Sequence, residues 1–170
     1  LEKANNIHHV GAVQSEYSLS TRFPELGLLQ KTKKLETAFI AFSPVGRGLL
    51  TDKPPTPERV KESPFLKVNP RFLEPNLSEN IKAVKGFQKL AKDYGLSTAG
   101  LAIAWLIAKD EHIIPIPGTR SNIHLKEMVK GTEKNLTQTD IDEIEKTLPV
   151  GWAHGDRYSD IQWIGPERYC

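Results

Sequence analysis

Three short apolar runs, each bounded by turn residues, divide the chain. The first run lies at the start of the segment "VGAVQSEYSL" (10–19) and extends to about Ser15. The second is "TAFIAF" within 37–48, which a Ser-Pro pair and two glycines stop, and the third opens "HIIPIPGTR" (112–120). Short apolar runs with such boundaries are typical of parallel strands covered on both faces. The pattern therefore predicts three buried strands.

A helical period follows the second run. Residues 78–95 carry one apolar stripe, with Ser78 as the expected N-cap and Gly95 as the expected stop. The stripe consists of Ile81, Val84, Leu90, Ala91 and Tyr94. The opening letters "LEKANN" have the character of a helix end, which suggests that the sequence is a piece of a longer protein.

Three more helices are expected around the third run. Residues 97–110 are apolar nearly all round, which predicts a well-buried helix that begins at Ser97. Residues 122–131 and 136–148 form the other two, the latter capped by Thr137. Strands that alternate with helices predict an α/β fold with a parallel sheet. Such folds keep their sites at the carboxyl ends of the strands.

Two segments lack a clear period. Residues 51–77 contain six prolines, which predicts a long irregular loop of functional or mobile character. The C-terminal tail 151–170 is rich in aromatic residues, and we expect it to pack against the rest of the molecule.

Composition and charge exclude several classes of protein. The chain is 38% hydrophobic and 26% charged, as in globular domains. Its net charge of +2 is too small to indicate a surface that binds nucleic acid. Cys170 is the single cysteine, which fits a reducing compartment and a cytoplasmic location. No apolar run approaches the roughly 18 residues of a membrane span. We therefore expect neither a nucleic acid nor a membrane as a partner.

The third strand runs directly into Gly118, Thr119 and Arg120, just before a helix. The first amides of that helix point back at the turn, and its dipole favours an anion there. A hydroxyl and a guanidinium complete the donors of a phosphate site. The alternative is a left-handed turn followed by a solvated arginine.

The ends of the first two strands also carry candidate chemistry. In "FSPVGRGLL" (42–50), Phe42 offers a flat ring, Ser43 a hydroxyl, and the glycines permit close approach of a ligand. Such turns are also common without any ligand. In "QSEYS", Gln14 requires partners for both ends of its amide, which a ligand carboxamide or a neighbouring strand could provide.

The order of these segments resembles the C-terminal half of an aldo-keto reductase. The matching segments, over roughly residues 1–150, are "AVQSEYSL", "FIAFSPVGRGLL", "NPRF", "GLSTAGLAIAWLIA", "IIPIPGTRS" and "LTQTDIDEIE". The resemblance implies a (β/α)8 TIM barrel that binds NADP(H), of which residues 1–170 form the C-terminal portion with strands six, seven and eight. It also implies reduction of a small-molecule aldehyde or ketone to an alcohol, with hydride from NADPH and a proton from a lysine-assisted tyrosine.

The resemblance assigns roles to individual residues. Gln14 would bond the nicotinamide carboxamide, and Phe42 would stack on the nicotinamide ring. The pyrophosphate would lie along Ser43, Pro44, Val45, Gly46, Arg47, Gly48 and Leu49. The adenosine 2′-phosphate would lie at Gly118, Thr119 and Arg120, and the adenine would lie beside His124, Glu127 and Met128. Met128 departs from the family, which usually has asparagine there.

Other aromatic residues are candidates for the substrate pocket. Tyr17 would face it, and Trp152, Tyr158 and Trp163 of the tail would form walls of it. The alternative for the tail residues is packing beneath the helices of the barrel.

The family's catalytic Asp, Tyr, Lys and His belong to the first half of the barrel, which this sequence does not contain. Three strands would leave two open sheet edges, which invite aggregation. We therefore expect the missing N-terminal half as a partner, and an inactive chain without it. The alternative function is a nucleotide-binding, non-catalytic relative with a regulatory role.

Overall fold

The computed structural model describes residues 1–165. The strands are β1 (Ala12–Glu16), β2 (Ala38–Phe42) and β3 (Ile113–Ile116), which confirms the three predicted runs. The helices are α1 (Glu2–Asn5), α2 (Leu28–Lys34), α3 (Pro57–Glu62), α4 (Asn76–Asp93), α5 (Thr98–Lys109), α6 (Asn122–Thr132) and α7 (Gln138–Thr147). Short 3₁₀ turns occupy Phe23–Leu26, Gly46–Gly48, Leu66–Val68, Pro70–Phe72 and Gln162–Ile164.

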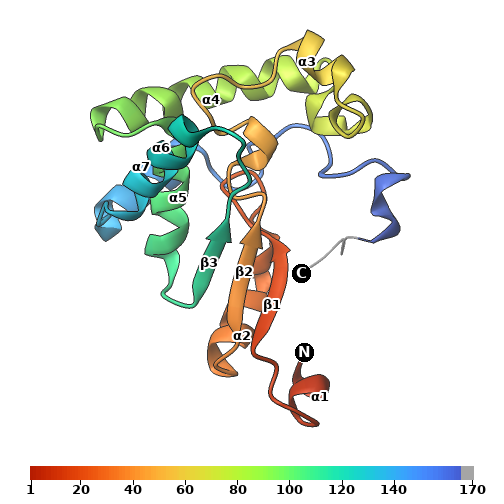
Figure 1. The fold of residues 1–170 in the computed structure, drawn as a ribbon, viewed down its shortest axis with the longest axis vertical. Helices are drawn as coiled ribbons and strands as arrows, with labels where there is room; N and C mark the ends of the chain where they lie inside the picture. The colour runs from red at the N-terminus through yellow and green to blue at the C-terminus, as the bar shows by residue number, and fades with distance from the viewer. Residues whose placement is uncertain (166–170) are drawn as a thin grey trace.

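The three strands form one parallel sheet in the order β1-β2-β3. Their arrowheads point the same way in Figure 1, so the three carboxyl ends lie on one side of the molecule. The register places Glu16 opposite Phe42, and Phe42 opposite Ile116. The chain segments that follow the strands therefore start close together.

One face of this sheet is packed and the other is open. Phe39 and Ala41 point into the core with no exposed surface, and α2 and α5 pack against the sheet. On the opposite face of β3, Ile114 and Ile116 remain 47% and 43% exposed. The expectation of strands covered on both faces is therefore wrong for residues 1–165, because their helices cover a single face.

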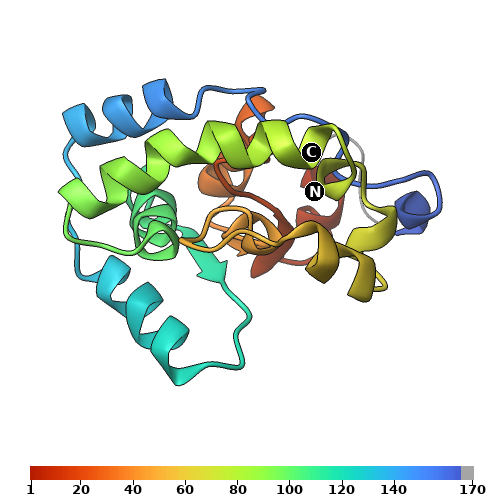
Figure 2. The same cartoon turned by 90° about the horizontal axis from the view of Figure 1, so that it is seen from above.

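The core is centred on α5. Trp105 has no exposed surface, and its ring lies 5.3 Å from that of Tyr17, which in turn meets the edge of Phe39 at 5.9 Å. α5 is buried over most of its length, as its all-round apolar pattern predicts. Ser97 caps it by accepting a hydrogen bond from Gly100 N at 3.0 Å. Figure 2 shows α4 running beside α7, and Figure 1 shows α4 beyond the carboxyl ends of the strands.

Two expectations for residues 51–95 are wrong, one about a helix start and one about the regularity of a loop. α4 begins at Asn76, so Ser78 is inside the helix rather than at its cap. Pro75 precedes the first turn, where its fixed φ suits a helix start, and Ser78 N donates to the Glu74 carboxylate at 3.3 Å. The segment 51–77 is also less irregular than expected, because it holds α3, two 3₁₀ turns and the start of α4.

The tail packs as expected as far as residue 165. Trp152 Nε1 donates to Leu19 O at 2.8 Å, and Gln162 Nε2 donates to Phe65 O at 2.9 Å. Residues 166–170, which include the single cysteine, lie outside the described residues.

Candidate functional site

The turn after β2 has an unusual backbone. Ser43, Gly46, Arg47 and Gly48 all have φ between 52° and 94°, in the left-handed region. At Gly46 a Cβ would meet Ser20 Oγ at 2.9 Å, so the turn requires glycine there. Ser43 and Arg47 adopt this conformation with a side chain, at a cost that structures tolerate mainly at functional positions.

A cavity of about 480 Å³ opens beside this turn. Its walls come from the end of β2, from the loop after α3 and from the tail. They consist of Phe42, Ser43, Arg47, Ser63, Phe65, Leu66 and Tyr158. Apolar rings with a few polar groups are the usual lining of a small-molecule site.

Arg47 is held between two aromatic rings of this cavity. Its guanidinium carbon lies 4.6 Å from the centre of the Tyr158 ring and 5.1 Å from that of Phe65. Its Nη2 donates to Glu16 Oε2 at 2.7 Å. Because Glu16 has no exposed surface and Arg47 little, this ion pair is poorly screened by solvent.

Two more arginines surround the same carboxylate. Arg157 Nη1 lies 3.9 Å from Glu16 Oε2, and Arg71 Nη1 donates at 2.8 Å to Thr21 Oγ1, which donates to Glu16 Oε1. Burial lowers the pKa of Arg71 to about 10, with Glu16 opposing this shift and the charges of Arg47 and Arg157 adding to it. Three guanidinium groups therefore lie close to the Glu16 carboxylate.

Burial and the charge of Glu16 also raise the pKa of the Tyr158 hydroxyl. Tyr158 is thus protonated near neutral pH, and it brings the tail to the cluster. Asn69 Nδ2 donates to Arg157 O at 2.6 Å, which fixes the tail to the loop after α3.

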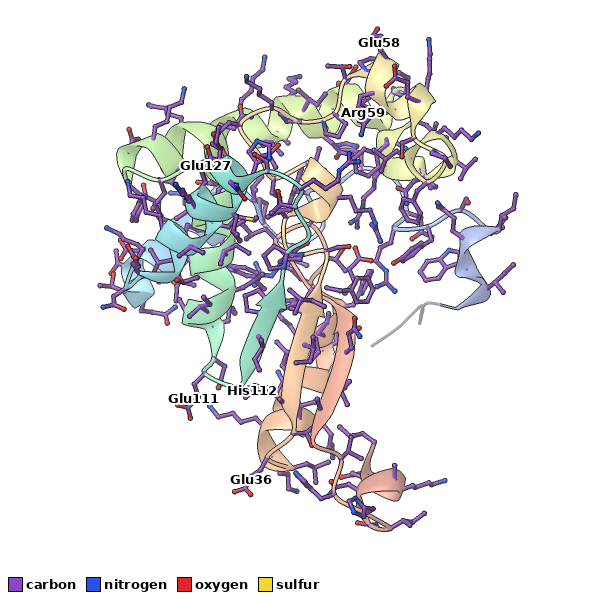
Figure 3. All side chains as sticks on the ribbon, viewed as in Figure 1. Glu36, Glu58, Arg59, Glu111, His112 and Glu127 are labelled. Carbon is purple, nitrogen blue, oxygen red and sulfur yellow. The ribbon has the colours of Figure 1, made fainter. Side chains whose placement is uncertain are left out.

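The start of α6 is a second feature at the carboxyl ends of the strands. Gly118, Thr119 and Arg120 are exposed there, and Ser121 caps the helix by accepting from His124 N at 3.4 Å. Figure 3 labels Glu127 on α6 at this side of the molecule. The helix N-terminus and an exposed guanidinium are therefore available to an anion.

The structure does not bring all the predicted site residues together. Gln14 is exposed on the open face of β1, rather than buried as expected, because no helix of the described chain covers that face. Pro44, Gly46 and Leu49 are buried within the turn, so they can offer a ligand little more than their backbone.

Three predicted contacts lie elsewhere. Tyr17 does not face a pocket, because its ring is in the core and its hydroxyl donates to Glu25 Oε1 at 2.7 Å. Met128 packs with Ala99 and Ile103 between α6 and α5, away from the exposed face of α6 that carries His124. Trp152 packs against the core and is not among the residues that line the cavity.

The buried part of the site is what sequence reasoning missed. Glu16 lies within the segment "QSEYS", but the sequence assigns no role to it, to Arg71 or to Phe65. Arg47 meets Glu16 and Phe65, and Arg71 meets Thr21, across long stretches of sequence, so no local periodicity reveals these contacts. The available signal was a charged residue within an apolar run, which requires a partner when buried.

A second hollow of about 290 Å³ lies near the amino end of β3, where Figure 3 labels His112. His112 Nδ1 lies 2.9 Å from Asp110 Oδ1, and its Nε2 lies 3.1 Å from Thr32 Oγ1. The order hydroxyl, imidazole, carboxylate resembles a nucleophile triad. However, the Thr32 hydroxyl is fully buried and points to the carbonyl groups of its own helix. The contacts therefore join α2 to β3.

Other chemistries find no support within residues 1–165. In that span no three His, Cys, Asp or Glu side chains gather in a way that could hold a metal ion. None of its helices has the length and apolar character to cross a bilayer.

Comparison with known proteins agrees with this geometry. The profile of the Aldo/keto reductase family matches residues 1–149. A probable aldo-keto reductase of Glycine max is 34% identical over 93% of this chain and 45% of its own length. An aldo-keto reductase of Gibberella moniliformis is 33% identical over 95% of this chain and 50% of its own. The chain thus spans about half the length of the curated relatives it matches.

Solved structures give the same architecture. The glycerol dehydrogenase of Gluconobacter oxydans superposes with a TM-score of 0.70 at 21% identity, over 85% of this chain and 44% of that one. A thermostable aldo-keto reductase solved with the inhibitor epalrestat superposes with a TM-score of 0.57 at 24% identity, over 80% and 39%. At these identities the likeness concerns the fold. The family match over most of the sequence carries the conclusion that this chain belongs to the aldo/keto reductase family.

Proposed function

We propose that the whole protein is an NADP(H)-dependent oxidoreductase that reduces aldehydes and ketones, and that this chain supplies its cofactor-binding half. The family membership supports oxidoreduction. A relative from Schizosaccharomyces pombe, 29% identical over 93% of this chain, has NADP(+) in its name. The chain matches only about half the length of each relative. This supports the assignment of β1 to β3 as the last three strands of an eight-stranded barrel, whose other strands belong to a partner segment or chain.

The observation that carries the proposal is the cavity at the carboxyl end of β2. Phe42 and Ser43 line it, and the left-handed turn follows directly. This arrangement fits a dinucleotide: Phe42 offers a ring for stacking, and the backbone of 43–49 can approach a pyrophosphate closely. NADPH, when bound, supplies the hydride for the carbonyl carbon.

The remaining roles follow from position. Gln14 lies on the open sheet face, from which its amide can reach a nicotinamide carboxamide. Gly118, Thr119 and Arg120 at the start of α6 would hold the 2′-phosphate, and the exposed His124 would border the adenine together with the half-exposed Glu127. Strong binding of the remote adenosine end helps to position the reacting ring.

An affinity measurement tests the proposal. In the protein at its natural length, Arg120→Ala removes a charge-assisted contact to the 2′-phosphate. We expect about tenfold to a hundredfold weaker binding of NADPH and little change for NADH, which lacks that phosphate. Fluorescence titration with both nucleotides measures this difference.

Arg59→Ala is the matched control, because Arg59 is an exposed arginine on α3 (Figure 3) whose guanidinium lies 3.5 Å from Glu62. It should leave both affinities unchanged. A wild-type protein that binds neither nucleotide would contradict the proposal. Tight NADPH binding without turnover of any aldehyde or ketone would favour the non-catalytic alternative.

A further inference from the structure

The carboxylate of Glu16 connects four segments of the chain. Glu16 is the last residue of β1, and its carboxylate accepts a hydrogen bond from Arg47 of the turn after β2. The carboxylate also accepts from the Thr21 hydroxyl, which in turn accepts from Arg71 in the loop before α4. Arg157 of the tail lies 3.9 Å from the same oxygen that Arg47 contacts. The walls of the cavity therefore share one buried anchor.

Electrostatics makes this anchor necessary. The guanidinium groups of Arg47, Arg71 and Arg157 gather where little solvent reaches, since the Arg157 side chain is 2% exposed and the Arg47 side chain 11%. Like charges at such sites repel strongly unless a carboxylate compensates them. Loss of the Glu16 charge would remove the carboxylate that holds the guanidinium of Arg47, and it would favour movement of Arg47 away from Arg71 and Arg157.

Separation would change the cavity itself. Arg47 is stacked between Tyr158 of the tail and Phe65 of the loop after α3, so movement of its guanidinium releases both rings. The tail is tied to that loop by Asn69 and Gln162, but its contact with the turn runs through the arginines. Glu16 therefore contributes to the placement of the turn relative to the tail, alongside the bonds of Asn80 to His154 and of Trp152 to Leu19.

We propose that Glu16 is a positioning residue that holds the turn 43–48 and the tail 152–165 closed around the same ligand. This inference rests on the proposed function for the identity of that ligand, NADPH. Glu16 touches neither substrate nor cofactor in this account. It acts through Arg47 and Arg157, and it makes docking of the tail and binding of the cofactor favour each other.

The test compares Glu16→Gln, Glu16→Asp and the wild type at natural length. For Glu16→Gln we expect NADPH to bind at least about tenfold more weakly, as for loss of a charged hydrogen bond. We also expect faster amide exchange in residues 152–165 and a raised KM, with a much smaller change in kcat at saturation. Glu16→Asp keeps the charge and should restore part of each effect.

Glu145→Gln is the matched control. Glu145 likewise joins two cations and an indole, with Arg22 at 2.7 Å, Lys109 at 2.8 Å and Trp105 Nε1 at 3.2 Å, and none of these residues lines the cavity. It should lower the melting temperature without changing NADPH affinity or exchange in the tail. If Glu145→Gln reproduces the changes seen with Glu16→Gln, the effect is one of general stability and the inference is overturned.

Two further outcomes are decisive. Folded Glu16→Gln protein with wild-type NADPH affinity and wild-type exchange in the tail overturns the inference while leaving the proposed function intact. If the wild type binds no NADPH, the proposed function fails, and exchange in the tail alone decides whether Glu16 positions it. Should Glu16→Gln not fold, Arg157→Met loosens the tail directly: faster exchange with weaker NADPH binding supports the inference, and no change in either overturns it.

Discussion

Asp140 shows how a single carboxylate can be tied to a helix start. Its Oδ2 accepts from Thr137 N at 2.7 Å, while Thr137 Oγ1 accepts from Asp140 N at 3.3 Å, which closes a capping box at α7. Its other oxygen accepts from the Tyr94 hydroxyl at 2.6 Å. The bond from Tyr94 and those from Thr137 lower the pKa of Asp140 to about 2. The charged form therefore stabilises the fold.

A pH dependence follows from this depressed pKa. The stabilisation is complete above the unfolded-state value near 3.8 and is lost as the pH falls through about 2. Asp140→Asn should lower the melting temperature at pH 5. In this variant the melting temperature should also decrease less between about pH 4 and pH 2 than in the wild type. Thermal unfolding at several pH values measures this slope.

Asp142→Asn is the control, because it removes the same charge from the exposed face of the same helix outside the capping box. It should leave the slope between pH 4 and pH 2 close to that of the wild type. Equal slopes in all three proteins would show that the capping box does not contribute.

The cap itself gives a second prediction at this scale. Thr137→Ala removes the hydroxyl that caps α7, and loss of such a cap costs about 1 kcal/mol in the free energy of unfolding. Thr139→Ala is the control, because Thr139 is an exposed threonine two residues further along, inside α7, and its loss should cost less. Chemical denaturation of both variants measures the difference, and equal losses would contradict the role of the cap.

Local chemistry of this kind is what the sequence reveals best. The sequence predicts a helix start at Ser97 and a cap at Thr137, because both depend on residues within one turn. The pair Glu16 and Arg47 was not predicted, since the two residues are 31 positions apart and meet through the fold of the sheet. Tyr17 was misplaced for the same reason, because the burial of its ring depends on α5.

At the scale of elements, two glycines set the distance between α5 and α6. A Cβ on Gly131 would lie 2.1 Å from Gly100 O, and one on Gly100 would lie 2.9 Å from Glu127 O. The helices therefore approach as closely as their backbones permit. This contact places the start of α6, and with it Arg120, relative to the sheet.

Gly131→Ala should force the two helices apart. We expect a loss of about 1 to 3 kcal/mol in the free energy of unfolding, as for overpacked cores, together with weaker NADPH binding in the natural-length protein. Denaturant unfolding and nucleotide titration measure the two effects. Gly86→Ala in α4 is the control, since its Cβ would meet Thr147 Cγ2 at an ordinary 3.4 Å and helix propensity favours alanine.

If Gly131→Ala unfolds at the denaturant concentration of the wild type, the close approach does not determine the packing of α6. The helices themselves are well predicted, because a long apolar segment such as α5 and an amphipathic one such as α7 are each distinct in the sequence. The start of α4 is predicted two residues too late, because Pro75 and not Ser78 occupies the N-cap position.

At the scale of the whole molecule, the sheet has two edges and one face that no segment of residues 1–165 covers. Gln14, Ile40 and Ile114 lie in register on the open face, whose apolar side chains on β3 are exposed. An apolar face beside free strand edges is an association site. The sequence pattern suggested full burial, because it reports how apolar a strand is but not which segment covers it.

The isolated 170-residue chain should therefore self-associate. Ile114→Lys places a charge on the open face and should reduce the apparent mass measured by light scattering toward 19.1 kDa. Ile7→Lys is the control: Ile7 is 89% exposed in the loop after α1, away from the sheet. A wild-type chain that stays monomeric at high concentration would contradict this prediction.

The tail also carries an optical signal. Of the three tryptophans, Trp105 is buried in the core and Trp152 donates a hydrogen bond to Leu19 O. The ring of the third, Trp163, lies in the tail, 5.1 Å from that of Tyr158. The Arg157 guanidinium lies over the same indole at 5.1 Å. Indole emission responds to a nearby cation and to water, so movement of the tail would alter the colour and intensity of Trp163 fluorescence. The protein thus contains its own unlabelled reporter, with which opening and closing of the cavity could be timed in stopped flow.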